Sequence, residues 1–294
     1  MSPTTTSKYT LVGYPLTDSI SLYVHQKLFE LSNKNSIYDL YAISQQNFKE
    51  SIEELMAHDG FNVTVPYKNA IIPHLDQLDE KASLYQEVNT VNCGDQNIGY
   101  NTESFGFLKA LQRIGVTLNH SEVLLLGVGE YAKMAAIETV LTGSKLTIAT
   151  RPQNIQYAEL LREMLMNINA SAHIRVIDTM QAQAHHDLLI NASPIGLSPH
   201  ISECPVPDKA IERVDAVFDF ICNPVQTRLL KLAEENGKPC SNGIPMLVWQ
   251  AVGAHRIWYD AQFADEDIEE LIENTEAMAA SGFTQDSSER ACQI

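Results

Sequence analysis

The chain has 294 residues, of which 45% are hydrophobic, and its formal net charge at pH 7 is −17. This length suits two domains of ordinary size, and the composition is typical of a globular protein with a substantial core. The acidic balance disfavours nucleic acid and anionic membranes as partners. No apolar run reaches the roughly 20 residues that a transmembrane helix needs, so we expect no membrane span.

The first hundred residues are expected to alternate between short strands and helices. Strands are predicted at residues 9–12, 36–42 and 62–65, and helices are predicted to begin near Ser21 and to cover residues 48–57. Pro66 should end the third strand, because proline has no amide hydrogen for the ladder. This alternation predicts an α/β unit.

A second unit opens with the continuous apolar run Val-Leu-Leu-Leu at residues 123–126. Such a run predicts a parallel strand that is buried on both faces. Further strands are expected at residues 146–150, 187–191 and 216–220, with helices at residues 131–142 and 157–168 between the earlier ones. This order is typical of a doubly wound Rossmann domain.

A long helix is expected from Asn242 onward, ending in the acidic segment 264–270. We expect this helix to pack back on the first unit, which makes the N-terminal domain discontinuous. The predicted domains are therefore residues 1–103 with 242–294, and residues 104–241. Residues 281–294 are polar and are expected to fray.

A glycine-rich turn, Gly127-Val128-Gly129-Glu130-Tyr131-Ala132, directly follows the apolar strand and precedes a helix. In a dinucleotide site the first glycine allows the tight turn, the second admits the pyrophosphate, and the alanine allows close helix–strand packing. A tight turn without a ligand is the alternative. Glu130 would compete with the pyrophosphate for the helix amides unless it points outward.

Arg151 follows the next strand, about twenty residues after the turn. An acidic residue there would bind the ribose hydroxyls of NAD, whereas an arginine can pair with a 2′-phosphate. We therefore expect NADP, with NAD possible and an ordinary exposed arginine as the alternative.

Lys68 lies just beyond a predicted strand end, where a loop can present it to a cleft. Such a lysine could exchange a proton with a substrate oxygen or could bind an anion, although most loop lysines are simply solvated. Asn62, Thr64, Asn89 and Asn101 also stand at strand ends and turns, where they could converge on it. Each of them could equally be a turn or cap residue.

Several ordered motifs resemble those of the shikimate dehydrogenase family, and together they span most of the chain. They are Gly-x-Pro-x-x-x-Ser-x-Ser at residues 13–21, Asn-Val-Thr-x-Pro-x-Lys at 62–68, Val-Asn-Thr at 88–90, Asn-Thr-Glu at 101–103, Asn-Ala-Ser-Pro-Ile-Gly at 191–196, and Asn-Gly-x-x-Met-Leu-x-x-Gln at 242–250.

The resemblance implies an NADP-dependent oxidoreductase that links shikimate with 3-dehydroshikimate by reversible hydride transfer. It implies that the discontinuous domain binds a small ring hydroxy acid and that the Rossmann domain binds NADP. Lys68 and Glu103 would form the acid–base pair. The implied substrate-binding residues are Ser19, Ser21, Asn62, Thr64, Asn89 and Gln250. The implied cofactor-binding residues are Gly127, Gly129, Ala132, Arg151, Ser193, Gly243 and Met246.

The chain departs from the family's pattern where ligands are expected to bind. Glu103 replaces an aspartate, Asp18 a histidine, Leu22 a proline, Cys222 a tyrosine and Glu130 a glycine. One extra methylene moves a carboxylate by more than the roughly 0.5 Å tolerance of a preorganised site. The alternatives are therefore a divergent paralogue that acts on quinate or another hydroxylated ring acid, and a catalytically weakened binding protein.

The remaining expectations concern compartment, metals and assembly. Residues 1–8 lack the layout of a signal peptide, and five scattered cysteines are typical of free thiols in a reducing cytoplasm. The pair His185-His186 has no carboxylate or cysteine at ligand spacing, so no metal is expected. We expect a cytoplasmic monomer or homodimer.

Overall fold

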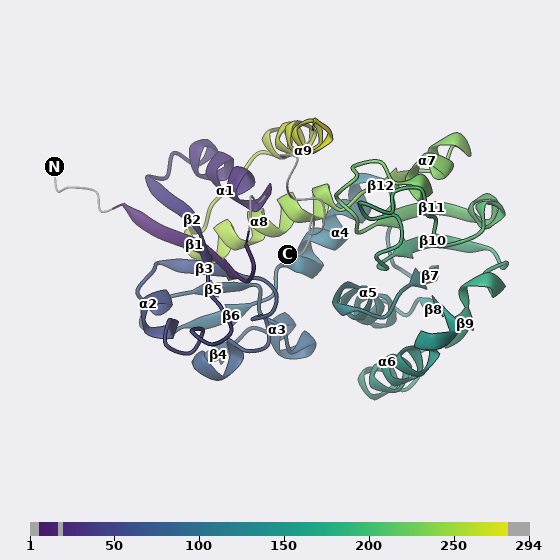
Figure 1. The fold of residues 1–294 in the computed structure, drawn as a ribbon, viewed down its shortest axis with the longest axis horizontal. Coiled ribbons are helices and arrows are strands. Elements are labelled where there is room, and N and C mark those ends of the chain that lie inside the picture. Colours follow the sequence, from purple (N-terminus) through teal and green to yellow (C-terminus); the bar gives the residue numbers. More distant parts are fainter. Residues whose placement is uncertain (1–5, 17–19, 282–294) are drawn as a thin grey trace. The chain divides into compact units, whose positions relative to one another are not determined.

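The chain forms two compact α/β units, each built on a 6-stranded sheet. The computed structural model describes residues 6–16 and 20–281 (Figure 1). Unit 1 comprises Met1–Gly106 with Met246–Ile294, and unit 2 comprises Phe107–Pro245. The predicted fold class, two α/β domains with a long C-terminal helix that returns to the first, is confirmed.

Unit 1 carries a mixed sheet with the strand order β2-β1-β3-β5-β6-β4. Strand β5 runs antiparallel to both of its neighbours, β3 and β6, while β1 pairs in parallel with β2 and β3. The elements are β1 (Ser7–Gly13), α1 (Ile20–Leu31), β2 (Ser36–Ala42), α2 (Ile52–Met56), β3 (Gly60–Val63), η1 (Ile72–His74), β4 (Gln77–Leu78), α3 (Glu80–Tyr85), β5 (Thr90–Asn92) and β6 (Ile98–Tyr100).

Two predictions in this unit need correction. The helix expected at residues 48–57 is limited to α2, because hydrogen-bonded turns such as Asn47 to Ser44 and Ser51 to Asn47 precede it. The third strand begins two residues earlier than expected and ends at Val63, before Pro66. Strands β4 and β6 are too short to leave a periodic pattern in the sequence.

Three further helices are α4 (Glu103–Arg113), which follows β6, and α8 (Ile244–Tyr259) and α9 (Asp265–Ala280), which follow the last strand of unit 2. The acidic segment does not end the long helix as predicted. It opens α9 instead, after the left-handed Asp260 (φ 54°) that follows α8. Acidic side chains in a first turn complement the positive end of the helix dipole, so this placement is favourable.

The end of α8 packs into the core of unit 1. The rings of Tyr9 and Trp258 stack with 4.5 Å between centroids, and the indole nitrogen donates to the carbonyl of Val91 at 2.9 Å. A Cβ at Gly60 would lie 2.4 Å from this nitrogen, so the glycine makes room for the indole. The burial of Trp258 fixes α8 on the sheet of its own unit.

Unit 2 has an all-parallel sheet with the strand order β12-β11-β10-β7-β8-β9. Counted along the chain this is the order 3-2-1-4-5-6 of a doubly wound Rossmann domain, with its switch point between β7 and β10. The elements are β7 (Glu122–Leu126), α5 (Glu130–Leu141), β8 (Lys145–Thr150), η2 (Pro152–Asn154), α6 (Ile155–Ile168), β9 (Ile174–Asp178), η3 (Thr179–Gln181), β10 (His186–Asn191), η4 (Asp208–Arg213), β11 (Val214–Asp219), α7 (Arg228–Glu235) and β12 (Cys240–Ser241).

The apolar run at residues 123–126 forms the centre of this sheet. Its four side chains are at most 1% exposed, and β7 pairs in parallel on both sides. The prediction of a parallel strand buried on both faces is confirmed.

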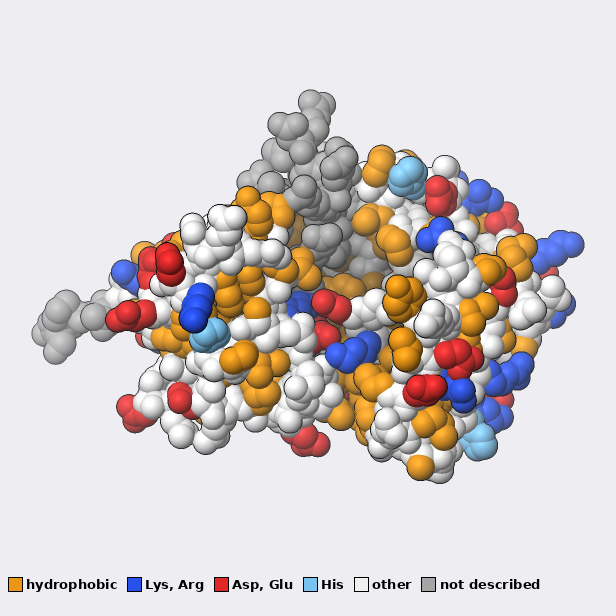
Figure 2. Space-filling model, turned by 60° about the horizontal axis from the view of Figure 1, so that its bottom comes forward, with side chains coloured by type: hydrophobic (Ala, Val, Ile, Leu, Met, Phe, Trp, Pro, Cys, Tyr) orange, Lys and Arg blue, Asp and Glu red, His pale blue; other side chains and the backbone are white. Residues whose placement is uncertain are grey.

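The surface mixes charge and apolar side chains. On the face drawn in Figure 2, acidic, basic and hydrophobic groups are interspersed. Among the helices of the described residues, none combines the length and apolar content needed to cross a bilayer. Cys93, Cys204 and Cys240 are free thiols, as expected.

Candidate active site

Lys68 and Glu103 are brought together in the interior of unit 1. Lys68 follows β3 by five residues, and its carbonyl accepts from the amide of Val88 at 3.0 Å. Glu103 is the first residue of α4. Lys68 Nζ lies 2.5 Å from Glu103 Oε1, and both side chains are only 2% exposed. The extra methylene of glutamate therefore does not prevent the carboxylate from reaching the lysine.

The pair is a buried ion pair, and its environment favours the charged form of each partner. Opposite charges at this distance stabilise one another more strongly in a dry interior than in water. Each group would be costly to bury alone. A lysine and a carboxylate held in contact in this way are suited to move a proton to or from a bound oxygen.

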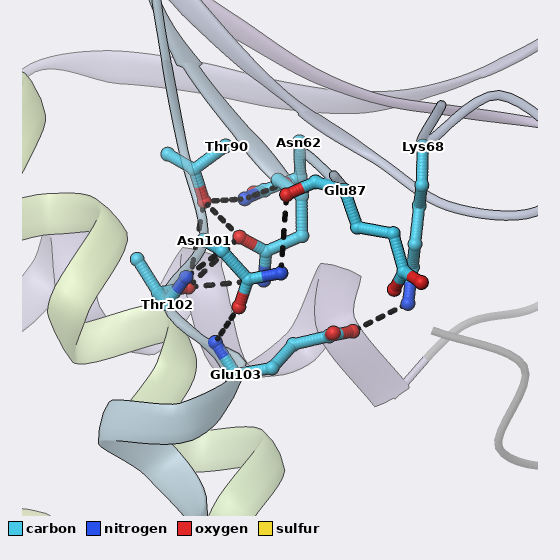
Figure 3. A network of polar contacts seen from close by, with 8 residues as sticks. Asn62, Lys68, Glu87, Thr90, Asn101, Thr102 and Glu103 are labelled. Atoms are coloured by element: carbon cyan, nitrogen blue, oxygen red, sulfur yellow. Dashed lines mark hydrogen bonds and ion pairs between the residues drawn. The ribbon is translucent and has the colours of Figure 1, made fainter. Parts of the chain in front are cut away.

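A network of amide and hydroxyl groups surrounds the start of α4 (Figure 3). Asn89 Oδ1 accepts from the amide of Thr102 at 2.9 Å, and Asn89 Nδ2 donates to Thr102 Oγ1 at 3.0 Å. Asn101 Oδ1 accepts from the amide of Glu103 at 3.0 Å. These bonds fix the backbone that presents the Glu103 carboxylate.

Asn62 links this network to the sheet. Its Nδ2 donates to the carbonyl of Asn89 at 3.1 Å and to Thr90 Oγ1 at 3.0 Å, and its Oδ1 accepts from the Tyr38 hydroxyl at 2.8 Å. An amide side chain has two donors and two acceptor lone pairs. Within the described residues, Asn62 thus keeps one lone pair and Asn89 keeps one N–H for a ligand.

Gln250 offers a further polar group in unit 1. It lies on α8 and is 7% exposed, and its Oε1 has no hydrogen-bond partner among the described residues. A buried carbonyl oxygen without a partner is costly unless a ligand or water supplies a donor.

Gly106 allows α4 to pack closely on α8, because a Cβ at this position would lie 2.4 Å from the Met246 carbonyl.

Of the other predicted substrate residues, the structure describes Ser21 and Thr64 but not Ser19. Ser21 and Thr64 are buried, 4% and 1% exposed, on α1 and just after β3. Ser19 and Asp18 lie outside the described residues. Leu22 packs against the hydrophobic cluster that contains Tyr9 and Trp258.

The glycine turn of unit 2 has the geometry expected of a phosphate-binding turn. Gly127 has φ +108°, and a Cβ there would lie 2.6 Å from the Ala192 carbonyl. Gly129 caps α5, and a Cβ at this position would meet nothing within 4 Å. No side chain caps the first amides of α5, and Glu130 is exposed, so the described residues leave this helix end open to an anion.

A cavity of about 170 Å³ adjoins this turn, and its lining includes Gly127, Gly129, Arg151 and Ser193. Ala132 is fully buried behind the turn, as close helix–strand packing requires. These residues fit the phosphate and ribose groups of NADP: an open helix N-terminus for the pyrophosphate and a guanidinium for a 2′-phosphate.

Two predicted cofactor residues do not line this cavity. Gly243 lies against the Phe220 carbonyl, where a Cβ would approach to 2.3 Å, and Met246 is 3% exposed on α8. Close backbone packing within unit 2 explains why residue 243 is a glycine. Met246 belongs to unit 1, whereas the cavity lies in unit 2.

Asp219 is a buried residue of unit 2 that sequence reasoning missed. Its Oδ1 accepts from Asn191 Nδ2 at 3.0 Å, and its Oδ2 accepts from the Thr227 hydroxyl at 2.7 Å. Burial raises the pKa of Asp219 to about 7. Asn191 Oδ1 in turn accepts from the hydroxyl of Ser193 at 2.7 Å, so Asp219 supports a wall of the cavity through Asn191. The sequence feature that could have indicated Asp219 is its position directly after the apolar run Ala216-Val217-Phe218.

The structure also places carboxylates beside His185, which the sequence spacing did not indicate. His185 Nε2 lies 3.2 Å from Asp215 Oδ1, and the ligand atoms of His185, Asp187 and Asp215 lie within 4.8 Å of one another. His185 and Asp215 are exposed, and the Asp187 carboxylate accepts from the amide of Glu122 at 2.7 Å. Exposed clusters of this kind are common without a metal, and we assign no metal role to it.

Comparisons with known proteins point to one family. Residues 11–91 match the family model described as the shikimate dehydrogenase substrate binding domain. The chain is 33% identical to the shikimate dehydrogenase (NADP(+)) of Carboxydothermus hydrogenoformans over 253 residues, which cover 84% of this chain and 90% of the relative.

Two solved structures show the same similarity. Shikimate 5-dehydrogenase from Thermus thermophilus, in complex with NADP(H) and shikimate, has a TM-score of 0.80 and 28% identity, covering 92% of this chain and 99% of that one. The ligand-free 5-ketofructose reductase of a Gluconobacter species has a TM-score of 0.81 and 27% identity, covering 92% and 98%.

Proposed function

The chain belongs to the shikimate dehydrogenase family of NADP-dependent oxidoreductases, and on that premise we propose that it catalyses the reversible reduction of 3-dehydroshikimate to shikimate. The observation that carries the proposal is the buried contact of 2.5 Å between Lys68 and Glu103. This pair would be the acid–base group of the reaction, beside amides that each keep one hydrogen-bonding position for a ligand.

The proposed division of labour follows the two units. Unit 1 would bind the ring acid, and unit 2 would hold the cofactor at Gly127, Gly129, Arg151 and Ser193. When bound, NADP supplies or accepts the hydride. The protein groups would orient the substrate and move the proton.

In the direction of reduction, protonated Lys68 would donate a proton to the carbonyl oxygen as this oxygen becomes a hydroxyl. In the direction of oxidation, neutral Lys68 would accept the hydroxyl proton. Glu103 would hold the Lys68 side chain in place and stabilise its charged form. The substrate would be bound by Asn62, Asn89 and Gln250, together with Ser19, Ser21 and Thr64.

The test is the initial rate of NADPH formation with shikimate, for the wild-type protein and for Lys68→Ala. Proton transfer by a positioned group contributes about 10²–10⁴-fold to a rate, so the variant should lose activity by that factor. Circular dichroism provides the control that the variant is folded. Near-normal turnover by a folded Lys68→Ala variant would exclude this assignment.

A second candidate is a paralogue with another hydroxylated substrate, such as quinate. It is favoured by Glu103, whose side chain is one methylene longer than the aspartate of the family pattern, and by the similarity in fold to a 5-ketofructose reductase. The same assay with quinate and, in the reverse direction, with 5-ketofructose separates the two candidates. Absence of turnover with every substrate, in a folded protein that binds NADP, would favour a weakened binding protein.

The assembly and compartment are also proposals. We propose a cytoplasmic monomer or homodimer whose partner is a small hydroxy acid. Light scattering after size-exclusion chromatography distinguishes one copy from two.

A further inference from the structure

A second buried carboxylate, Glu87, lies beside the Lys68–Glu103 pair. Glu87 is 4% exposed and stands between α3 and β5. Its backbone is fixed on both sides: the amide donates to the Ala82 carbonyl at 3.2 Å, and the carbonyl accepts from Asn101 Nδ2 at 3.3 Å. The position of Glu87 therefore depends on the same network that presents Glu103.

The side chain of Glu87 is directed to the lysine. The amide of Val88 donates to the carbonyl of Lys68, which brings the two backbone segments together. Figure 3 shows Glu87 and Glu103 both extending their carboxylates toward the ammonium end of Lys68. Three ionisable residues, each at most 4% exposed, thus share one site.

The charges of this site do not cancel within the three residues. Two ionised carboxylates and one ammonium leave a formal charge of −1, and an unbalanced charge in a dry interior is unfavourable. The protonated form of Lys68 reduces this imbalance. The Glu87 carboxylate adds negative potential at Lys68 and so favours that form.

We propose that Glu87 is a positioning residue that, together with Glu103, holds the Lys68 ammonium in place and shifts the protonation equilibrium of Lys68 toward its charged form. Its effect on catalysis rests on the function proposed above. Its effect on the charge of Lys68 does not.

Other titratable groups on the neighbouring segments are engaged elsewhere. The Tyr67 hydroxyl donates to the Ile43 carbonyl, and the Asp79 carboxylate caps α3 by accepting from the amide of Ala82 at 2.7 Å. Among the described residues of these segments, Glu87 and Glu103 are the carboxylates that Figure 3 shows directed to Lys68.

The first test is the pH dependence of kcat/KM for reduction of 3-dehydroshikimate by NADPH. Glu87→Gln keeps the size of the side chain and removes its charge. Activity that requires protonated Lys68 should then be lost at a pH lower by about half a unit or more. Glu87→Asp should restore part of the shift. Glu138→Gln, which neutralises an equally buried glutamate of α5, is the matched control and should not move the profile.

A profile for Glu87→Gln that coincides with that of the wild type would overturn the proposal. A uniform loss of activity at all pH values, without displacement of the profile, would also overturn it, because that result indicates a structural role.

The second test does not need activity. Lysine labelled with ¹³C at Cε gives an NMR signal for Lys68, assigned by its disappearance in Lys68→Met, and its shift reports protonation. The midpoint of titration should be lower in Glu87→Gln than in the wild type. The proposal would also be supported if Lys68 titrates in Glu87→Gln at a pH below that of unfolding, while Lys68 of the wild type shows no titration in the same range. Equal midpoints, or no titration in either protein, would overturn it. If the wild type fails to reduce 3-dehydroshikimate, the function is wrong while this measurement still decides the role of Glu87.

Discussion

The buried ion pair of unit 1 predicts strongly non-additive effects on stability. At the observed 2.5 Å and an effective dielectric constant of about 20, the gross attraction between Lys68 and Glu103 is about 7 kcal/mol. Desolvation of the two groups offsets much of it. Removing one partner leaves the other charge buried without compensation, which typically costs about 3–5 kcal/mol.

The perturbation is a double-mutant cycle with Lys68→Met, Glu103→Gln and the combined variant. Each single variant should lower the free energy of unfolding by about 3–5 kcal/mol. The combined variant should lose less than the sum, with a coupling energy of at least about 2 kcal/mol. Lys68→Met should be the more damaging single change, because it leaves both Glu87 and Glu103 without the lysine.

Urea unfolding monitored by tryptophan fluorescence suits this measurement. Trp249 and Trp258 are the two tryptophans of the sequence, and both lie on α8 within unit 1, the unit that holds the pair. The signal therefore reports on the relevant unit. A coupling energy below about 0.5 kcal/mol would refute the reasoning, because it would mean that the two groups act independently.

Three further predictions follow from groups described above or packed nearby. Burial lowers the pKa of His25, which contacts His255 at 2.9 Å, from 6.5 to about 3. The unfolded state therefore binds an extra proton between these values, and stability should fall as the pH drops below 6.5. His25→Phe should flatten this acid limb by up to about 1.4 kcal/mol per pH unit in urea unfolding, and an unchanged limb would contradict the assignment. Asp219→Asn should weaken NADP binding about fivefold in calorimetry, because the bonded chain that orients Ser193 loses an acceptor worth about 1 kcal/mol, and an unaltered Kd would count against it. Arg151→Ala should weaken NADP binding about tenfold to a hundredfold, because it removes a hydrogen bond between charged groups. NAD binding should change little, since NAD has no 2′-phosphate. Equal losses of affinity for NADP and NAD would argue against a 2′-phosphate contact.

The nucleotide-binding unit was largely predictable from the sequence. Its central strands are continuous apolar runs, and burial on both faces of a parallel sheet requires that pattern. The glycine turn was predictable for a related reason, since the contact between Gly127 and the Ala192 carbonyl excludes a side chain.

The candidate active site was less accessible to sequence reasoning. Its residues come from separate segments that only the mixed sheet brings together, so Lys68 and Glu103 could be paired only through the resemblance. Glu87 left no signal, because a glutamate between Gln86 and Val88 has no periodicity that separates a buried carboxylate from a solvated one. The short strands β4 and β6 were missed because tertiary pairing, not local propensity, forms them.

The antiparallel pairing of β5 has a consequence for how the chain could change in length. Thr90 is paired with Asn62 on one side and with Tyr100 on the other, so losing or gaining one residue inside β5 would turn its side chains to the opposite faces. The connection between β5 and β6 is different. Its residues Gly94, Asp95 and Gln96 are exposed, and a Cβ at Gly94 would meet nothing within 4 Å. The tip of this hairpin is therefore a position where an inserted peptide or a fluorescent label could be accommodated without altering the strand register that the site requires.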